Sequence, residues 1–314
     1  SDLVAWKSAH VTPIYKKGPS SDPANYRPIS QTSIFCKLLE RVIVADLTAY
    51  MLMKGFISKH QHGFINKRST TTNLLESLSD WTFAINNKLT QTIIYVDFQK
   101  AFDTVSRPKL TIKMEGYGIH GDLLNLLVDF LSNRDQRTKV GESLSKRSFL
   151  QSGIVQGSCL GPLLFLIFVS DLPAIFDPEV KPKMYADDLK LYTSIVTNSD
   201  TVRLQKNIDR LVNWANTWQL TISIRKCQAL HLGRRDETAN PIFFIGSSAL
   251  EYIDKVSDLG VQVDHDLKFS VHINQIVRKA LTRSNLLLKS FVSRDILVNN
   301  LLPLNSTSHN IFSS

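Results

Sequence analysis

The sequence contains few cysteines and no long apolar run. Cys36, Cys159 and Cys227 are its only cysteines, and no two of them form a C-x-x-C motif. An odd number of widely separated cysteines argues against a disulfide framework and a zinc site, and favours a reducing compartment. The longest apolar run, residues 163–169, is far shorter than the ~20 residues that a membrane-spanning helix needs. We therefore expect no membrane partner.

A secretory signal is also missing from the start of the sequence. The first ten residues, SDLVAWKSAH, have neither a charged n-region nor an apolar h-region. The chain does not begin with Met, so we expect a fragment or a processed chain, acting inside the cell.

Positive charge is in excess. The net charge is +9 and the sequence pI is about 9.4, which favours an anionic partner such as nucleic acid. The basic residues form small clusters, including Lys16-Lys17, Lys67-Arg68 and 134–139. Such clusters could line a groove that follows a phosphate backbone, or they could be separate solvated surfaces.

The apolar pattern predicts alternating helices and strands. Four prolines within residues 1–30 argue against a helix there and predict irregular or extended structure. The compact run TIIYV, Thr92 to Val96, predicts a buried strand, and residues 220–232 are strand-like. Helical spacing and capping residues predict helices over residues 32–53, 70–86, 106–116, 122–132, 160–176 and 204–218. Residues 255–263 and 273–288 complete the ordered pattern, and periodicity ends after about Leu297.

The segment MYADDLKLY, Met184 to Tyr192, places two adjacent aspartates between apolar strand-like residues. It predicts a hairpin with Asp187 and Asp188 at its tip, while Asp97 ends the strand 92–96. If these strands are neighbours, three carboxylates converge and raise each other's pKa values. Divalent cations such as Mg²⁺ or Mn²⁺ would remove this repulsion and support phosphoryl transfer. The alternative is an ordinary turn closed by Asx hydrogen bonds.

Several motifs together resemble a known family. YADD, DFQKAFDTV (97–105) and QSGIVQGSCLGPLLF (151–165) resemble the motifs of reverse transcriptases. AWKSAHVTPIYKKG, NYRPIS, QHGFINKRSTTTNLLE and SDLGVQVD narrow this resemblance to the polymerases of non-LTR, jockey-like retrotransposons. The resemblance covers roughly residues 5–297, with the motifs in family order.

The resemblance implies an α+β fold of the right-hand polymerase type. Its fingers, palm and thumb would include an antiparallel palm sheet backed by helices. We expect fingers at 1–90, the palm at 91–260 with 108–150 contributing to the fingers, a partial thumb at 261–297 and a disordered tail at 298–314. The thumb is expected to be incomplete because the tail departs from the family, and the family's endonuclease is absent from this chain.

The resemblance also implies a set of metal-site residues. Asp97, Asp187 and Asp188 match the family's metal-binding carboxylates, and the carbonyl of Phe98 matches a backbone ligand. Phe102 matches the bulky gate that excludes ribonucleotides, because a ring beneath the sugar leaves no room for a 2′-hydroxyl. Core packing is the alternative role for Phe102.

Further residues match positions that contact the nucleotide and the base pair. They are Lys16, Lys17 and Arg27 for the incoming triphosphate, Gln156 and Gly157 beside the nascent base pair, and Lys226 as a proton donor to pyrophosphate. Four of them have a structural alternative: a solvated turn for the two lysines, a helix-entry turn for Gly157 and an exposed strand position for Lys226. Asp103 is expected to have a structural role at a helix start.

The resemblance implies an RNA-directed DNA polymerase. It would extend a primer 3′-hydroxyl with dNTPs on an RNA template, using two Mg²⁺ ions with Mn²⁺ as an alternative, and would act in the nucleus. The main alternative is a decayed or domesticated copy that binds RNA without catalysis. Three departures favour it: Val155 replaces the usual Pro and is expected to loosen the turn before Gln156, Cys159 replaces Val, and Ser223 replaces Asn. Another palm enzyme, such as a nucleotide cyclase or an RNA polymerase, is opposed by the fingers motifs and Phe102.

Overall fold

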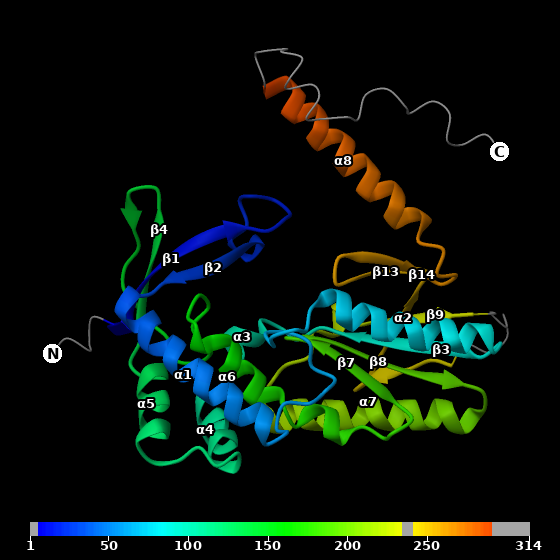
Figure 1. The fold of residues 1–314 in the computed structure, drawn as a ribbon, viewed down its shortest axis with the longest axis horizontal. Helices are drawn as coiled ribbons and strands as arrows, with labels where there is room; N and C mark the ends of the chain where they lie inside the picture. The colour runs from blue at the N-terminus through cyan, green and yellow to red at the C-terminus, as the bar shows by residue number, and fades with distance from the viewer. Residues whose placement is uncertain (1–5, 234–240, 291–314) are drawn as a thin grey trace.

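The computed structural model describes residues 6–233 and 241–290. These residues form two larger sheets with helices packed around them, and a long helix that extends away from the rest (Figure 1). We call the sheet of β2, β1, β4, β5 and β6 the N-terminal sheet, and the sheet of β12, β9, β3, β8 and β7 the central sheet.

The N-terminal sheet joins two distant parts of the chain. Strands β1 (Ser8–Tyr15) and β2 (Tyr26–Gln31) are antiparallel and are linked through the short 3₁₀ helix η2 (Pro23–Asn25). Strand β4 (Asp135–Val140) pairs parallel to β1, and the short strands β5 (Ser143–Leu144) and β6 (Ser148–Phe149) pair with β4. The irregular or extended structure predicted for residues 1–30 is confirmed for β1 and β2, whereas η2 is a helical turn that begins at Pro23, a position where proline is tolerated.

The central sheet is built around β3 (Thr90–Val96), which carries the predicted apolar run. It pairs antiparallel with β8 (Asp188–Ile195) on one side and β9 (Gln228–Leu232) on the other. Strand β7 (Lys181–Tyr185) completes the predicted hairpin with β8. At the opposite edge, β12 (Glu251–Ile253) pairs parallel to β9, so the sheet is antiparallel except at this edge.

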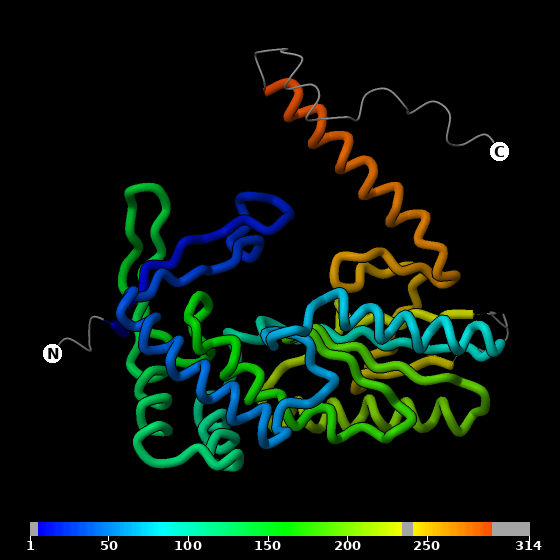
Figure 2. The backbone as a smooth tube through the Cα atoms, viewed as in Figure 1, coloured from blue at the N-terminus to red at the C-terminus, as the bar shows by residue number. Residues whose placement is uncertain are grey.

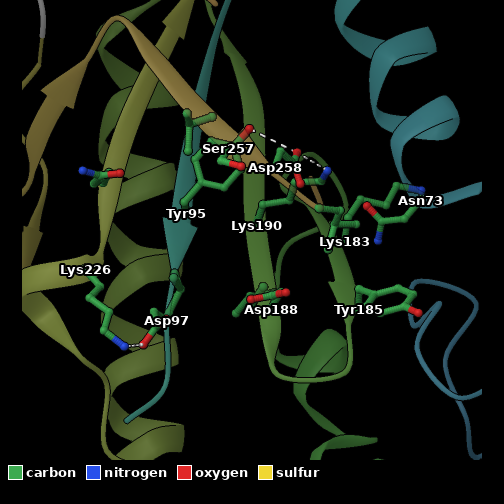
Figure 3. Close-up of a pocket in the computed structure, with 15 residues that line it drawn as sticks. Asn73, Tyr95, Asp97, Lys183, Tyr185, Asp188, Lys190, Lys226, Ser257 and Asp258 are labelled. Carbon is green, nitrogen blue, oxygen red and sulfur yellow. Dashed lines mark hydrogen bonds and ion pairs between the residues drawn. The ribbon is translucent and has the colours of Figure 1, made fainter. Parts of the chain in front are cut away.

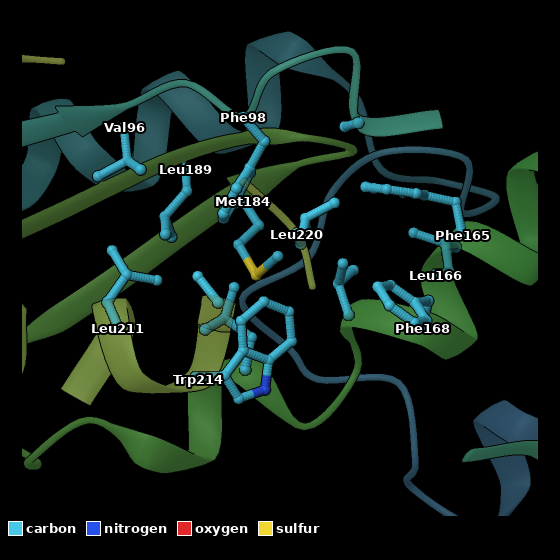
Figure 4. Close-up of a cluster of buried hydrophobic side chains, with 14 of the residues drawn as sticks. Val96, Phe98, Phe165, Leu166, Phe168, Met184, Leu189, Leu211, Trp214 and Leu220 are labelled. Carbon is cyan, nitrogen blue, oxygen red and sulfur yellow. The ribbon is translucent and has the colours of Figure 1, made fainter. Parts of the chain in front are cut away.

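Helices cover both faces of the central sheet. Alternate residues of a strand point to opposite faces, so Ile94 packs with α6 (Leu160–Val169) and α7 (Asn198–Trp218), whereas Ile93 packs with Trp81 of α2 (Thr70–Asn86). Figure 4 shows the first of these clusters, where Leu189, Met184 and Trp214 meet beneath the sheet. This two-sided burial fixes the strands that carry the aspartates.

The remaining elements surround this core. Helix α1 (Ile34–Met53) packs against α6. The other helices are α3 (Ala101–Thr104), α4 (Arg107–Gly116), α5 (Gly121–Leu131), η3 (Leu172–Ile175) and η4 (Ile224–Lys226). Two small hairpins follow, β10–β11 (Phe244–Ile245, Ser248–Ala249) and β13–β14 (Lys255–Asp258, Val261–Asp264). Helix α8 (Ser270–Ser290) has no buried residue and projects from the body (Figure 2).

Three predictions need correction. The helix predicted over 160–176 ends at Val169, because the chain turns at Ser170 and Pro173 then enters the separate helix η3. The strand predicted over 220–232 is shorter than expected: η4 occupies part of this range, and β9 begins at Gln228. Arg134 does not belong to a basic surface: it is 1% exposed and donates hydrogen bonds to the carbonyls of Phe130 and Trp6. The predicted tail at 298–314 lies outside the described residues.

Candidate active site

The three aspartates come together at one end of the central sheet. Val96 of β3 pairs with Leu189 of β8, so Asp97 and Asp188 are the next residues along these neighbouring strands. Tyr185 pairs with Asp188, which leaves a two-residue turn, Ala186-Asp187, between β7 and β8. The predicted hairpin is confirmed, except that Asp188 is the first residue of β8 and only Asp187 lies in the turn. Strands β3 and β8 are neighbours, which was the condition for the carboxylates to converge.

A cavity of about 1140 Å³ lies between this end of the central sheet and the N-terminal sheet. Asp97, Phe102 and Asp187 line it from one side, and Lys16 and Arg27 line it from the other. The cavity therefore brings together residues from four separate motifs. Phe98, Gln156 and Lys226 also line it, whereas Lys17, Gly157 and Asp188 do not.

A smaller cavity of about 310 Å³ adjoins the first and shares Asp97 and Lys226 with it. Asp188 lines this second cavity rather than the large one. Figure 3 shows the Lys226 ammonium directed at Asp97, with Asp188 on the neighbouring strand. The Nζ atom of Lys226 lies 3.1 Å from Oδ1 of Asp97. Lys226 therefore faces a carboxylate, and it lies in η4 instead of the predicted exposed strand.

The pKa values of the two carboxyls of the hairpin are raised. Burial raises the pKa of Asp188 to about 6, and repulsion from Asp187 and Asp97 adds to this rise. Burial also raises the pKa of Asp187, with repulsion from Asp97 adding to the rise and Lys16 opposing it. Both causes act against ionisation of Asp188, with burial the larger and repulsion by the neighbouring carboxylates the smaller.

The backbone at Phe98 leaves its carbonyl available. Phe98 forms a bridge with Ile222, but the hydrogen bonds of this bridge come from the flanking residues. Ser223 N donates to the Asp97 carbonyl and Gln99 N donates to the Thr221 carbonyl, each at 2.8 Å. In this antiparallel pattern the central residue does not use its own carbonyl. The carbonyl of Phe98 is therefore not consumed by the bridge.

Phe102 has both a packing contact and a cavity contact. Its ring stacks on Phe165 with centroids 4.5 Å apart and an interplanar angle of 19°, and it meets Phe64 edge-on at 6.1 Å. Because the ring also lines the large cavity, the position is compatible with the predicted gate and with the core-packing alternative at once.

The segment before α6 is fixed by specific hydrogen bonds. Gln156 Nε2 donates to Oδ1 of Asp103 at 2.7 Å, which gives Asp103 a role in holding Gln156. Gly157 has φ +105°, and a Cβ there would lie 2.5 Å from the carbonyl oxygen of Ser30. The structure thus agrees with the predicted close backbone approach. The turn closes without proline, because the Val155 carbonyl accepts hydrogen bonds from both Ser158 N and Ser158 Oγ.

The family assignment now follows from comparison with known proteins. A family model described as "Reverse transcriptase (RNA-dependent DNA polymerase)" matches residues 14–263. The chain belongs to the reverse transcriptase family. This assignment confirms the resemblance inferred from the motifs.

Relatives of this reverse transcriptase occur among retrotransposon proteins. It is 29% identical over 298 residues to "Probable RNA-directed DNA polymerase from transposon BS" of Drosophila melanogaster, covering 88% of this chain and 32% of the relative. It is 29% identical over 291 residues to "RNA-directed DNA polymerase from mobile element jockey" of the same organism, covering 89% of this chain and 31% of the relative. The chain spans about a third of the length of these curated relatives.

Solved structures show the same fold. The reverse transcriptase resembles "Structure of telomerase from Candida Tropicalis in complexe with TWJ fragment of telomeric RNA" with a TM-score of 0.57 and 13% identity, covering 84% of this chain and 45% of that chain. It also resembles an apo telomerase from the same organism, truncated of its C-terminal domain, with a TM-score of 0.54, 12% identity, and coverage of 84% and 54%. The predicted right-hand α+β fold is confirmed by these neighbours.

The donor set of this reverse transcriptase fits divalent metal ions, which the family generally uses. Within residues 6–233 and 241–290, no three His, Cys, Asp or Glu side chains are close enough to hold an ion alone. Mg²⁺ is usually bound through one or two carboxylates plus substrate phosphates, and not by an all-protein cage. Mutually repelling carboxyls beside an unused carbonyl match this type of site.

Across the same described residues, no helix is long and apolar enough to cross a membrane.

Some residues beside the carboxylates were not predicted as site residues. Tyr95, Lys190 and Asp258 line the smaller cavity with Asp188, and Lys183 completes its wall (Figure 3). One signal was present in the sequence: Lys190 follows Asp188 by two residues, so both point to the same face of β8. Asp258 is distant in sequence and carried no such signal.

Proposed function

We propose that this chain catalyses RNA-directed DNA synthesis, in which a primer 3′-hydroxyl attacks the α-phosphate of a dNTP and pyrophosphate leaves. The observation that supports it best is the placement of Asp97 and Asp187 in a cavity that Lys16 and Arg27 also line. The carboxylates and the basic residues come from opposite walls, which is the arrangement needed to hold a triphosphate against a catalytic centre.

The proposed metal ligands are Asp97, Asp187, Asp188 and the Phe98 carbonyl. Two Mg²⁺ ions bound there, with Mn²⁺ as a substitute, would activate the attacking oxygen and stabilise the leaving one. Lys226, which pairs with Asp97 in this structure, would donate a proton to the departing pyrophosphate.

The other residues orient the substrates. Arg27 grips phosphate oxygens with its forked donors, and Lys16 adds a positive charge beside them. Lys17 is exposed outside the cavity and would reach the phosphates only through the flexibility of its side chain. Phe102 lies beneath the sugar and excludes a 2′-hydroxyl. Gln156 and Gly157 support the nascent base pair of the RNA template and DNA primer.

The test is primer extension on an RNA template with an annealed DNA primer, dNTPs and Mg²⁺. Asp187→Asn should abolish extension, and EDTA should do the same. Asp209→Asn is the matched control, because it makes the same chemical change on the exposed side of α7. Extension that survives Asp187→Asn would refute the proposal.

The same assay decides between the alternatives. Folded protein that binds the duplex but never extends it would favour a copy that binds RNA without catalysis. Efficient incorporation of rNTPs would favour an RNA polymerase, and product formation without a template would favour a nucleotide cyclase. Nuclear action is proposed from the family's use of chromosomal DNA as primer, and imaging of the tagged chain in host cells would test it.

A further inference from the structure

The QHGF segment, His60 to Phe64, lies directly beside the hairpin that carries Asp187 and Asp188. His62 N donates to the Met184 carbonyl at 2.8 Å, and Met184 N donates to the His60 carbonyl at 2.9 Å. Gln61 and Met184 thus form a parallel bridge at the outer side of β7. The segment acts as a short additional strand next to the hairpin, more than 120 residues away in sequence.

The turn of this hairpin has an unfavourable backbone conformation. Ala186, the residue before Asp187, has φ +57°, a region that favours glycine. A two-residue hairpin turn requires a positive φ at its first position, and this chain meets the requirement with alanine. Such a conformation persists only where its surroundings hold it in place.

Gln61 supplies contacts to both backbone groups of Ala186. Ala186 N donates to Oε1 of Gln61 at 2.9 Å, and Nε2 of Gln61 donates to the Ala186 carbonyl at 3.2 Å. Gly63 N also donates to the same Oε1 atom at 2.8 Å, which fixes the orientation of the amide. Gln61 is only 4% exposed, so water does not compete well for these hydrogen bonds.

The close approach of Gly63 to the turn completes the arrangement. A Cβ on Gly63 would lie 2.3 Å from Ala186 N. The backbone would have to shift to remove this clash. Only glycine lets the QHGF segment come near enough for the Gln61 amide to reach both groups of Ala186. The two residues therefore work as one feature.

We propose that Gln61 is a positioning residue for the reaction: its side-chain amide holds Ala186 in its positive-φ conformation and thereby aims the Asp187 and Asp188 carboxylates. The effect on turnover rests on the proposed function, whereas the effect on the turn does not. Gln61 contacts neither substrate nor metal in this role and acts through the backbone.

The test compares two variants of buried glutamines, Gln61→Met and Gln91→Met. Methionine has a similar volume but cannot make the amide hydrogen bonds. Gln91 is a matched control because it is 6% exposed and donates a hydrogen bond to Ser194 Oγ at 3.0 Å, at the other end of β3. Two quantities are measured: hydrogen exchange in peptides that cover the Ala186 amide, and kcat and KM for dNTP in primer extension.

In Gln61→Met, we expect the protection of the Ala186 amide against hydrogen exchange to fall at least tenfold. We expect kcat to fall at least tenfold as well, while KM changes less than threefold. Gln91→Met should keep both within threefold. Ala186→Gly, combined with Gln61→Met, should restore most of the lost kcat, because glycine adopts a positive φ without help. If Gln61→Met does not fold, Gln61→Asn replaces it, since its amide is one methylene too short to span Ala186.

Four results would overturn the proposal: unchanged protection and kcat in Gln61→Met, a fall in kcat while Ala186 stays protected, an equal loss in Gln91→Met, or no recovery with Ala186→Gly. An inactive wild-type chain would instead count against the proposed function. In that case the exchange measurement alone still decides whether Gln61 holds the turn.

Discussion

A buried ion pair fastens the β13–β14 hairpin to the strand that carries Asp188. Lys190 Nζ lies 2.5 Å from Oδ2 of Asp258, and the two side chains are 4% and 5% exposed. Tyr95 OH donates to the same carboxylate oxygen at 3.2 Å. Burial lowers the pKa of Lys190, and the charge of Asp258 opposes this fall. Asp258 supplies the counter-charge that the buried Lys190 ammonium needs, and Tyr95 adds a neutral hydrogen bond to the same carboxylate.

Removing one partner should therefore cost much more than removing both. Asp258→Ala leaves a buried ammonium without its counter-charge, which typically costs about 3–5 kcal/mol. Replacing both residues with apolar ones of similar size, as in Lys190→Met with Asp258→Leu, is often neutral or stabilising. The double variant should thus be more stable than Asp258→Ala alone.

Thermal unfolding followed by circular dichroism measures the difference. At about 2 °C per kcal/mol for a chain of this size, Asp258→Ala should lower Tm by roughly 6–10 °C. Asp266→Ala is the control, because it breaks an exposed pair with Lys268 at 2.9 Å and should leave Tm unchanged within about 1 °C. A Tm loss below about 2 °C in Asp258→Ala, or a double variant as unstable as the single one, would refute the reasoning.

Three further predictions concern other parts of the site. Burial lowers the pKa of His60 from 6.5 to about 4, so its neutral form favours folding; this stability is present above pH 6.5 and is lost as pH falls toward 4. The free energy of unfolding should therefore fall less steeply with decreasing pH in His60→Asn than in the wild type, and an unchanged pH dependence would contradict this. Gly157→Ala forces a Cβ to within 2.5 Å of the Ser30 carbonyl oxygen and should reduce primer extension at least about tenfold, at a cost of roughly 1–3 kcal/mol. Gly141→Ala is its control, since that glycine also has a positive φ but an open surrounding; equal losses in both would exclude the contact as the cause. Phe102→Val should raise rNTP incorporation relative to dNTP at least about tenfold in competition assays, because the smaller side chain leaves room for a 2′-hydroxyl. Unchanged selectivity would leave Phe102 with its packing role against the core only.

Local sequence patterns were sufficient to predict the main elements of the site. The apolar run before Asp97 and the apolar flanks of Asp187 and Asp188 depend on strand alternation, which is a short-range property. The resemblance to reverse transcriptases then implied that these strands belong to one antiparallel palm sheet. Helix α2, predicted at 70–86, is observed as Thr70–Asn86, because Ser69 and Thr72 form a local capping box.

Contacts between distant segments were not predictable in the same way. Gln61 and Ala186 are 125 residues apart, and nothing in either local pattern indicates their hydrogen bonds. Lys190 follows an acidic pair and would normally be expected at the surface. Its burial depends on Asp258, 68 residues away. Such pairs are fixed by how separate segments pack, so sequence periodicity carries no information about them.

Gln61 and Asp258 support the same β7–β8 hairpin by different means, and their loss should have different consequences. Gln61 holds two backbone groups of one turn residue, so its removal changes where the carboxylates point while the two-sided core keeps the sheet folded. Asp258 neutralises a buried charge, so its removal acts on folding of the whole sheet. We therefore expect Gln61→Met to reduce kcat at least about tenfold while Tm falls less than in Asp258→Ala, because the lost hydrogen bonds are neutral and no buried charge is left unpaired. Asp258→Ala should show a large loss of Tm but a small change in kcat, when kcat is measured well below its Tm. If both variants lose kcat and Tm in proportion, the hairpin is held as a single cooperative unit and the separate positioning role of Gln61 is wrong.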